Sequence, residues 1–398
     1  MDRQTALSLI AQIVEKRLAE RQSQLGIGVM SGLTGLALFF IYTGQALGEQ
    51  RYMDTGHALL EQVIDQLNEG TYLPVRRMHS FSNGITGIAF AFLHMQRQQL
   101  IDVDIEETFA VFDEQLVKAA LQDYQDGISD FLHGPMGVFY YFSKRYPHHK
   151  SVAVHMDQLL QGFIQCARID QQGLRIRNMI LQETGDLDYD LGLAHGMTGN
   201  IFILAESMNA GYHTQEIKAL IENGLKYICN RERVIDRCWG NSCFPSSVNE
   251  QYPFGAPENL SGYNSRLAWC YGDLNIAMLF IRMGRLLNKQ ELYEKGVAVG
   301  RLTANRLTYD ENHVGDIYFC HGAAGVRYSY DKLYQLTGDQ CFLEARTFWE
   351  QQLFERLQPE RIDVDSNMKL FTLLEGLPGI GLSLLPAGIQ WDQFFLLQ

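Results

Sequence analysis

Strongly apolar segments alternate with amphipathic segments along almost the whole chain. Residues 36–44 and 200–208 are examples of the first kind, and a helix that is apolar on every face is buried on every face. Residues 52–67 and 342–357 are examples of the second, with Leu, Val, Phe and Ile three or four positions apart among polar residues. The pattern predicts helical hairpins that each contain one buried helix and one surface helix.

A Gly-x-x-Gly pair precedes each apolar segment and marks the start of a repeat. The first glycines of the pairs are Gly32, Gly84, Gly134, Gly196, Gly322 and Gly376, and a degenerate copy at Gly272 has Asn275 as its second member. Successive first glycines lie 52, 50, 62, 76, 50 and 54 residues apart, so seven hairpins account for nearly the whole chain. We interpret the second glycine of each pair as a site of close helix packing.

The last repeat is apolar to its end, whereas an open solenoid normally ends in polar capping helices. The predicted fold class is therefore all-α, an (α/α)7 toroid or barrel of seven inner and seven outer helices with minor β or loop insertions, forming a single domain over residues 1–398. The two longest steps place the insertions at about 168–193 and 231–266. We expect a strand or hairpin around Leu174, a short strand near Cys243, and both insertions at the mouth of the toroid.

Composition narrows the classes of partner. The formal charge is −13, from 33 basic and 46 acidic residues, and no basic patch favours nucleic acid. No apolar run approaches the roughly 20 residues that span a bilayer, and the charged amphipathic start of the chain is unlike a signal peptide. An odd number of cysteines, seven, without a tight framework indicates a reducing compartment. We expect a cytoplasmic protein without an integral membrane segment.

Two cysteines occupy the same position of adjacent repeats. Cys270 and Cys320 each stand two residues before the first glycine of their repeat, and His321 follows Cys320 directly. The inner helices of a toroid run parallel, so we expect these three side chains to approach one another. Two thiolates and an imidazole suit one Zn²⁺ ion with its fourth position open. The alternative is a pair of buried thiols beside a core histidine.

Polar residues also occupy the position just before the first glycine, where the flanking sequence is apolar. They are Ser31, Asn83, His133, His195, Tyr271, His321 and Glu375. Asp130 lies four residues before Gly134, and Arg266 lies six before Gly272. Singly, Asp130 could cap a helix, Arg266 could be an exposed charge and His195 a core histidine. As a set they surround the predicted zinc site.

The motifs that carry these residues resemble those of the LanC family, the lanthionine synthetase cyclases. They are Arg266-Leu-Ala-Trp-Cys-Tyr-Gly272, Phe319-Cys-His-Gly322, Leu191-Gly-Leu-Ala-His-Gly196 and Asp130-Phe-Leu-His-Gly134. The resemblance implies an (α/α)7 toroid that binds one zinc ion, works with a dehydratase partner, and cyclises dehydrated precursor peptides by adding cysteine thiols to dehydroalanine or dehydrobutyrine. Asp273-Leu274-Asn275 and His133 depart from the family pattern.

The resemblance implies that Cys270, Cys320 and His321 are the zinc ligands, and that His195, Asp130, Arg266 and Tyr271 are the catalytic groups. Only a thiolate attacks an electron-poor alkene, and a metal ion deprotonates a thiol. We assign His195 as the general acid and Asp130 as its orienting partner, while Arg266 or Tyr271 stabilises the enolate. His133 is the competitor for the role of His195.

Two other functions remain open at this point. A related enzyme could add glutathione or another small thiol to dehydroamino acids, which is the same step between two molecules. A helical peptide-binding scaffold could instead hold a structural zinc, with His133 or His195 as the fourth ligand.

Overall fold

The computed structural model describes residues 1–72, 75–181, 188–235, 240–308, 312–358 and 368–398. Cys238 lies outside these residues. The chain divides into two compact units. Unit 1 contains Met1–Phe112, Asp316–Tyr328 and Thr347–Gln398, and unit 2 contains Asp113–Gly315 and Ser329–Arg346. That the whole chain is a single domain stays a prediction.

Every Gly-x-x-Gly element leads directly into a buried helix, as the hydrophobic pattern predicts. The inner helices are α2 (Leu33–Leu47), α4 (Ile85–Arg97), α7 (Pro135–Arg145), α9 (Met197–Asn209), α12 (Asp273–Leu286), α15 (Ala323–Thr337) and α17 (Leu377–Ser383). In α2 every residue from Leu33 to Gly44 is buried, because apolar side chains cover all faces of the helix.

The surface helices have one buried stripe each. They are α1 (Arg3–Arg21), α3 (Gln50–Glu69), α6 (Asp113–Gln125), α8 (Ala153–Cys166), α10 (Thr214–Cys229), α13 (Gln290–Ala304) and α16 (Gln340–Arg356). In α3 the stripe consists of Tyr52, Gly56, Leu59, Leu60 and Val63, which recur at helical spacing. The described residues thus contain seven inner and seven outer helices.

The remaining helical segments are short. They are α5 (Ile105–Phe109), α11 (Pro257–Leu260), η1 (Gln22–Gln24), η2 (Ala110–Phe112), η3 (Lys150–Val152), η4 (Met179–Leu181), η5 (Ser261–Tyr263), η7 (Met368–Phe371) and η8 (Gln390–Phe395). In the part of the chain that the structure describes, no helix has both the length and the apolar character needed to cross a membrane.

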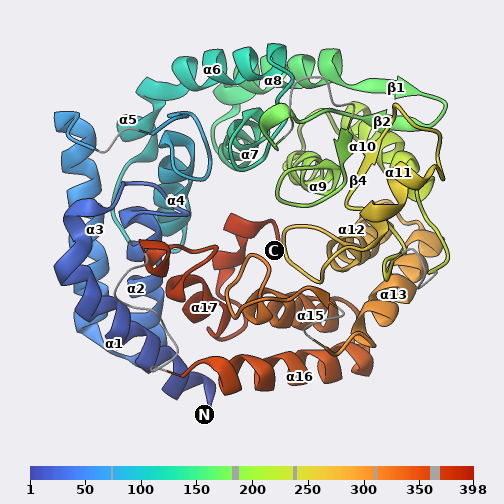
Figure 1. Cartoon of the computed structure of the whole chain (residues 1–398). Helices are drawn as coiled ribbons and strands as arrows, with labels where there is room; N and C mark the ends of the chain where they lie inside the picture. The colour runs from blue at the N-terminus through green and yellow to red at the C-terminus, as the bar shows by residue number, and fades with distance from the viewer. Residues whose placement is uncertain (73–74, 182–187, 236–239, 309–311, 359–367) are drawn as a thin grey trace. The chain divides into compact units, whose positions relative to one another are not determined.

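The last inner helix obtains its surface partner from the start of the chain. After α17 the described chain forms only η8, and inside unit 1 both α1 and α2 pack against α17 (Figure 1). A Cβ atom added at Gly381 would lie 2.3 Å from the ring of Phe39 and 3.4 Å from Leu7, so the three helices are in close contact. Leu373 also donates a backbone hydrogen bond of 2.8 Å to Met30. Within unit 1 the first and last repeats therefore meet, as the apolar end of the sequence predicts.

Backbone hydrogen bonds join the loops that lead into consecutive inner helices. In each case the acceptor is the carbonyl of the residue two before the first glycine. In unit 1 they run from Met30 to Ser82, from Leu373 to Met30 and from Cys320 to Leu374, and in unit 2 from Ala194 to Cys270, at 2.7–3.0 Å. Within each unit, these bonds confirm that the loops of consecutive repeats are neighbours, and in unit 1 they also join the last repeat to the first.

The second glycine is required by the loop of its own repeat rather than by a neighbouring helix. A Cβ atom at Gly325 would lie 1.8 Å from the carbonyl oxygen of Phe319, six residues earlier. In the degenerate fifth repeat, Asn275 occupies this position, and its Nδ2 donates to the equivalent carbonyl, that of Trp269, at 3.4 Å. The amide thus replaces a close backbone approach with a polar contact.

Both insertions form antiparallel pairs of strands inside unit 2. β1 (Arg168–Asp170) pairs with β2 (Gly173–Arg175), which confirms the hairpin expected around Leu174. β3 (Asp188–Asp190) pairs with β4 (Ser247–Asn249), so one strand from each insertion contributes to this sheet. The strand expected near Cys243 was placed wrongly, because the backbone N–H groups of Cys243 and Phe244 donate instead to the carboxylate of Asp273.

Candidate active site

His195 and Asp130 meet at the starts of two inner helices of unit 2. His195 lies in the loop before α9 and Asp130 in the loop before α7, and Nδ1 of the imidazole lies 2.7 Å from Oδ2 of the carboxylate. The Asp130 side chain is fully buried, whereas 23% of the His195 side chain is exposed. A buried carboxylate on Nδ1 fixes the tautomer and the orientation of the ring, so Nε2 is the nitrogen that would exchange a proton with a substrate.

Asp130 is held by two further hydrogen bonds. Its Oδ1 accepts from the backbone N–H of His133 at 2.7 Å, and its Oδ2 accepts from Asn178 Nδ2 at 2.6 Å. Burial alone would raise the pKa of Asp130, but the charge and hydrogen bond of His195, the charge of His133 and the Asn178 amide outweigh it and lower that pKa. The carboxylate is therefore ionised at neutral pH.

Asn178 belongs to the first insertion and was not expected at this site. The same amide nitrogen donates to the carbonyl of His195 at 2.7 Å, so one side chain holds both partners of the pair. Asn178 is buried. No repeat position identifies it, because the insertion has no counterpart in the other hairpins.

The imidazole of His133 stacks on that of His195, with ring centroids 5.6 Å apart and an interplanar angle of 12°. Asp130, His133 and His195 offer ligand atoms within 4.8 Å of one another, a geometry that could hold a metal ion. The polar residues before the glycines of repeats three and four are thus neighbours. In unit 1 the equivalent residues of repeats one and two, Ser31 and Asn83, share a hydrogen bond of 2.8 Å.

A second carboxyl group lies beside the same loop. Asp190 ends β3, and its Oδ1 accepts a hydrogen bond of 2.5 Å from the backbone N–H of Gly192. Burial raises the pKa of Asp190 to about 6, although the Gly192 N–H and the charge of His195 act in the opposite direction. Asp190 stands six residues before Gly196, the position that Arg266 occupies before Gly272, so the repeat could have identified it.

The loop that carries Arg266, Cys270 and Tyr271 lies next to the His195 loop. The backbone N–H groups of Leu193 and Ala194 both donate to the carbonyl of Cys270, at 2.8 and 3.0 Å. The guanidinium carbon of Arg266 lies 5.5 Å from the centroid of the Tyr271 ring, and both residues are half-buried, whereas Cys270 is buried. Unit 2 therefore brings together the loops of all four predicted catalytic residues and one predicted zinc ligand.

The other two predicted ligands lie in unit 1. A ligand atom of Cys320 and one of His321 lie within 4.8 Å of each other. Nε2 of His321 lies 3.4 Å from Oδ2 of Asp316, and Oδ1 of Asp316 accepts from the backbone N–H of Tyr318 at 2.8 Å. A carboxylate behind one ring nitrogen is typical of a histidine that binds a metal through the other. Asp316 was not predicted, although it stands six residues before its glycine, as Asp190 and Arg266 do.

The chemistry of the donors fits zinc. Two thiols and one imidazole match the softness of Zn²⁺, and three protein ligands are the usual number where the fourth position receives water or substrate. That Cys270, Cys320 and His321 converge on one ion stays a prediction.

Comparison with known proteins decides the family. Residues 23–388 match the model of the lanthionine synthetase C-like proteins. The chain belongs to this family. The resemblance noted in the loop motifs is thereby confirmed over nearly the whole sequence.

Among solved structures, this lanthionine synthetase C-like chain is similar to nisin cyclase. The TM-score is 0.74 at 16% identity, and the match covers 99% of this chain and 96% of the other. The likeness confirms the predicted fold class, the all-α (α/α)7 toroid. A curated relative, "Glutathione S-transferase LANCL1" of Danio rerio, is 20% identical over 319 residues, which are 78% of this chain and 70% of that protein.

The structure accounts for one departure from the family pattern. Asp273 is the first residue of α12, and its carboxylate accepts the backbone N–H groups of Cys243 and Phe244 at 2.7 and 2.9 Å. It therefore anchors the second insertion to the helix that begins just after Cys270 and Tyr271. Burial raises the pKa of Asp273 to about 6, although these two hydrogen bonds lower it.

Proposed function

We propose that this chain is a zinc-dependent lanthipeptide cyclase. It adds cysteine thiols to dehydroalanine or dehydrobutyrine within a dehydrated precursor peptide, which gives lanthionine and methyllanthionine rings. The observation that carries the proposal is the His195–Asp130 pair, held at 2.7 Å in a loop that is hydrogen-bonded to the loop of Cys270. Membership of the lanthionine synthetase C-like family supports the reaction class.

Cys270, Cys320 and His321 are the proposed ligands of one zinc ion. Each backbone bond between consecutive repeats brings equivalent loop positions together, and the two cysteines hold one such position in repeats five and six. When bound, zinc would lower the pKa of the substrate thiol, so that the thiolate form is available near neutral pH. Asp316 orients His321 through Nε2.

The four proposed catalytic residues act on the dehydro residue that the thiolate attacks. A C–S bond forms at the β-carbon of the dehydro residue, and the electron pair of the double bond passes to an enolate. Arg266 and Tyr271, in contact at 5.5 Å, stabilise the negative charge on the enolate oxygen. His195 delivers a proton from Nε2 to the α-carbon, and ionised Asp130 stabilises the imidazolium form that precedes this transfer.

The substrate of this reaction implies an earlier one. A dehydro residue arises by loss of water from Ser or Thr, so a dehydratase partner must act on the peptide first. Free thiols persist in reducing compartments, and we therefore propose that the reaction takes place in the cytoplasm.

Addition of a small thiol is the second candidate function. The similar relative is named as a glutathione S-transferase, and the same His195, Arg266 and Tyr271 would serve an intermolecular addition. A peptide-binding scaffold with structural zinc is a third candidate. It would need a fourth protein ligand, for which His133 and His195, the latter through Nε2, are the candidates.

One competition experiment tests the proposal. A synthetic peptide with one dehydroalanine and one cysteine is incubated with the zinc-loaded protein and an excess of glutathione, and the products are separated by mass. The expected result is ring formation. It leaves the mass of the peptide unchanged and consumes its free thiol, so the peptide no longer reacts with an alkylating agent. A product heavier by one glutathione would favour the second function, and an unreacted peptide would favour the scaffold.

A further inference from the structure

The two insertions meet at a cleft of about 370 Å³ in unit 2. Its lining includes Arg168 and Gln172 from the first insertion and Arg231, Glu250, Tyr252 and Phe254 from the second. None of these residues belongs to the His195 site. Long insertions between regular elements are commonly functional, and here two of them build one concave surface.

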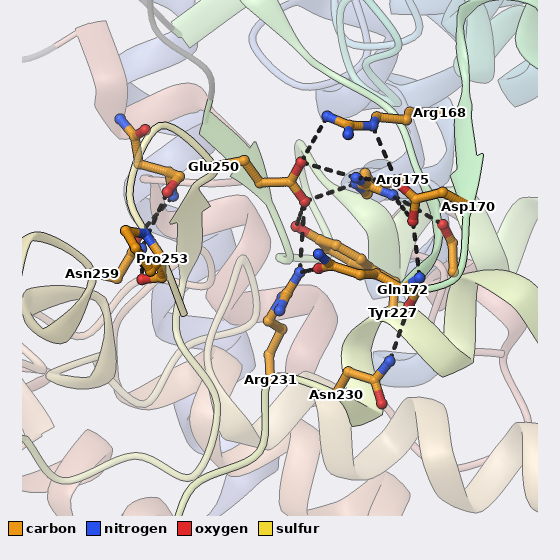
Figure 2. Close-up of polar contacts among 12 residues, drawn as sticks. Arg168, Asp170, Gln172, Arg175, Tyr227, Asn230, Arg231, Glu250, Pro253 and Asn259 are labelled. Atoms are coloured by element: carbon orange, nitrogen blue, oxygen red, sulfur yellow. Dashed lines mark hydrogen bonds and ion pairs between the residues drawn. The ribbon is translucent and has the colours of Figure 1, made fainter. Parts of the chain in front are cut away.

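Glu250 is the centre of the polar network at this cleft, as Figure 2 shows. Its Oε2 accepts from Arg168 at 3.2 Å and from Arg175 at 2.9 Å, and its Oε1 accepts from the Tyr227 hydroxyl at 3.1 Å. Arg175 is fully buried and also binds both oxygens of Asp170, at 2.8 and 2.9 Å. The hydrogen bonds of Arg175 hold the pKa of Asp170 well below its usual range. These hydrogen bonds and ion pairs hold the side chains of the cluster in place.

Positive charge is in excess in this cluster. Arg231 binds Gln172 and lies 3.5 Å from Glu250, and Arg233 lies close by. Four arginines are thus set against two carboxylates, Asp170 and Glu250. The chain as a whole has a net charge of −13, so this cationic cleft is a local exception. The excess of arginines suits a ligand with one or two carboxylates. A polyanion would extend beyond the cleft and be repelled by the acidic surface around it.

Exposed aromatic rings form the rim of the cleft. Tyr252 is 40% exposed and Phe254 is 51% exposed. The guanidinium carbons of Arg231 and Arg233 lie 5.4 and 5.2 Å from the centroid of the Phe254 ring. Cation–π contacts on this ring keep it at the surface in a fixed orientation. Aromatic rings next to arginine are the residue types enriched where proteins bind peptides and other proteins.

We propose that this cleft docks a segment of the peptide substrate in which a carboxylate stands beside large apolar side chains. The carboxylate pairs with Arg168 and Arg231, and the apolar side chains pack on Tyr252 and Phe254. The proposal deepens the proposed function and rests on it for the identity of the ligand as substrate.

The β3–β4 sheet connects the cleft with the candidate active site. Glu250 follows β4 directly, and β3 ends at Asp190, next to the loop that carries His195. The two strands pair in register, with Asp188 opposite Asn249 and Asp190 opposite Ser247. A peptide held at the cleft is therefore anchored to the same sheet that leads into the catalytic loop.

Fluorescence anisotropy with the full chain tests the proposal. The probe is a fluorescein-labelled peptide of twelve residues, Gly and Ser around a central Leu-Glu-Phe, without cysteine or dehydro residues. Arg168→Glu and Phe254→Ser are each expected to raise its Kd about tenfold, which corresponds to ~1.4 kcal/mol. Replacing the central Glu of the probe by Lys should have the same effect on the wild-type protein.

Two exposed residues of α13 provide matched controls. Arg301 has a side chain 61% exposed in an ion pair with Asp339, and Leu302 is 45% exposed. Arg301→Glu and Leu302→Ser should leave Kd within twofold of the wild-type value. The Lys probe should regain binding to Arg168→Glu, which separates lost complementarity from misfolding. No binding to the wild-type protein, equal binding of the Glu and Lys probes, or equal effects of cleft and control variants would overturn the proposal.

The probe cannot react, so docking and cyclisation are judged separately. Ring formation by a protein that fails to bind the probe overturns the docking cleft and leaves the proposed function standing. Binding with the expected variant pattern, but without ring formation by the zinc-loaded protein, overturns the proposed function and supports the cleft as a peptide site.

Discussion

Nδ1 of His195 lies 2.7 Å from Oδ2 of Asp130, although 65 residues separate the two in the chain. The carboxylate is fully buried and ionised, and the ring that it orients is partly exposed. This arrangement gives one imidazole a defined tautomer beside the Cys270 loop. It is the geometry expected of a positioned proton donor.

His195→Asn should abolish proton delivery without disturbing the proposed zinc ligands. We expect the rate of ring formation to fall by roughly 10²–10⁴, the usual contribution of a positioned acid or base. Stereocontrol at the α-carbon should be lost with it, because solvent can protonate either face. The measurements are zinc content by elemental analysis, the cyclisation rate, and the configuration of the product by chiral chromatography.

His133→Asn is the matched variant for this test, since the two imidazoles are stacked 5.6 Å apart. It should keep most of the activity and all of the stereocontrol. If His195→Asn retained normal rate and configuration while His133→Asn lost both, the proton donor would be His133.

Cys270→Ala or Cys320→Ala should remove bound zinc and ring formation together. Each substitution leaves two protein ligands, and sites with fewer than three seldom retain the ion. Cys166→Ala is the control, because Cys166 is exposed at the end of α8 and belongs to neither group of possible metal ligands among the described residues. A full equivalent of zinc in either ligand variant, measured after dialysis against metal-free buffer, would refute the ligand assignment.

Asp316→Asn should weaken zinc binding without removing a ligand. The carboxylate lies 3.4 Å from Nε2 of His321, and loss of such a partner typically lowers metal affinity by about 10–100-fold. Competition with a chromogenic chelator measures the affinity directly, independent of catalysis. Affinity unchanged within a factor of two would mean that Asp316 does not orient His321.

Asp273→Asn should change how stability depends on pH. Burial raises the pKa of Asp273 to about 6, whereas an unfolded aspartate titrates near ~3.9. Between these two pH values the native state keeps a proton that the unfolded state has released, so the free energy of unfolding falls as pH rises. The stabilising contribution of this protonation is complete below pH 4 and lost above pH 6.

Asparagine does not titrate. Between pH 4 and pH 7, the free energy of unfolding of the variant should therefore rise by about 3 kcal/mol relative to that of the wild-type protein. Guanidinium denaturation of both proteins at matched pH values measures the difference. A constant difference would show that the bonds from Cys243 and Phe244 cancel the effect of burial, and a change in the opposite direction would show that they outweigh it.

The inner helices could be predicted from sequence because one local signal, a glycine pair before an apolar segment, recurs in every hairpin. The partner of α17 could not be assigned this way, since α1 reaches it from the other end of the chain. The position of β4 was missed for a similar reason. A three-residue strand is determined by its pairing with β3, and no local pattern in residues 247–249 distinguishes it.

The same contrast holds for the candidate site. His195 and Asp130 follow from their register before the glycines, and Asp190 and Asp316 could have followed from the register of Arg266. Asn178 could not, because it lies in an insertion and reaches Asp130 only through the fold of that segment. The position of a residue relative to the repeat glycine therefore predicts which residues lie at equivalent places in the loops. Residues outside the repeat that hold them by hydrogen bonds are found only from the structure.

Zinc-dependent ring formation is the most direct test of the central claim. The synthetic peptide with one dehydroalanine and one cysteine is incubated with the protein as purified, after removal of metal by a chelator, and after one equivalent of zinc is restored. The thiol available to an alkylating agent is followed with time. The account predicts ring formation in the first and third samples and none in the second. Equal rates in all three samples would contradict it.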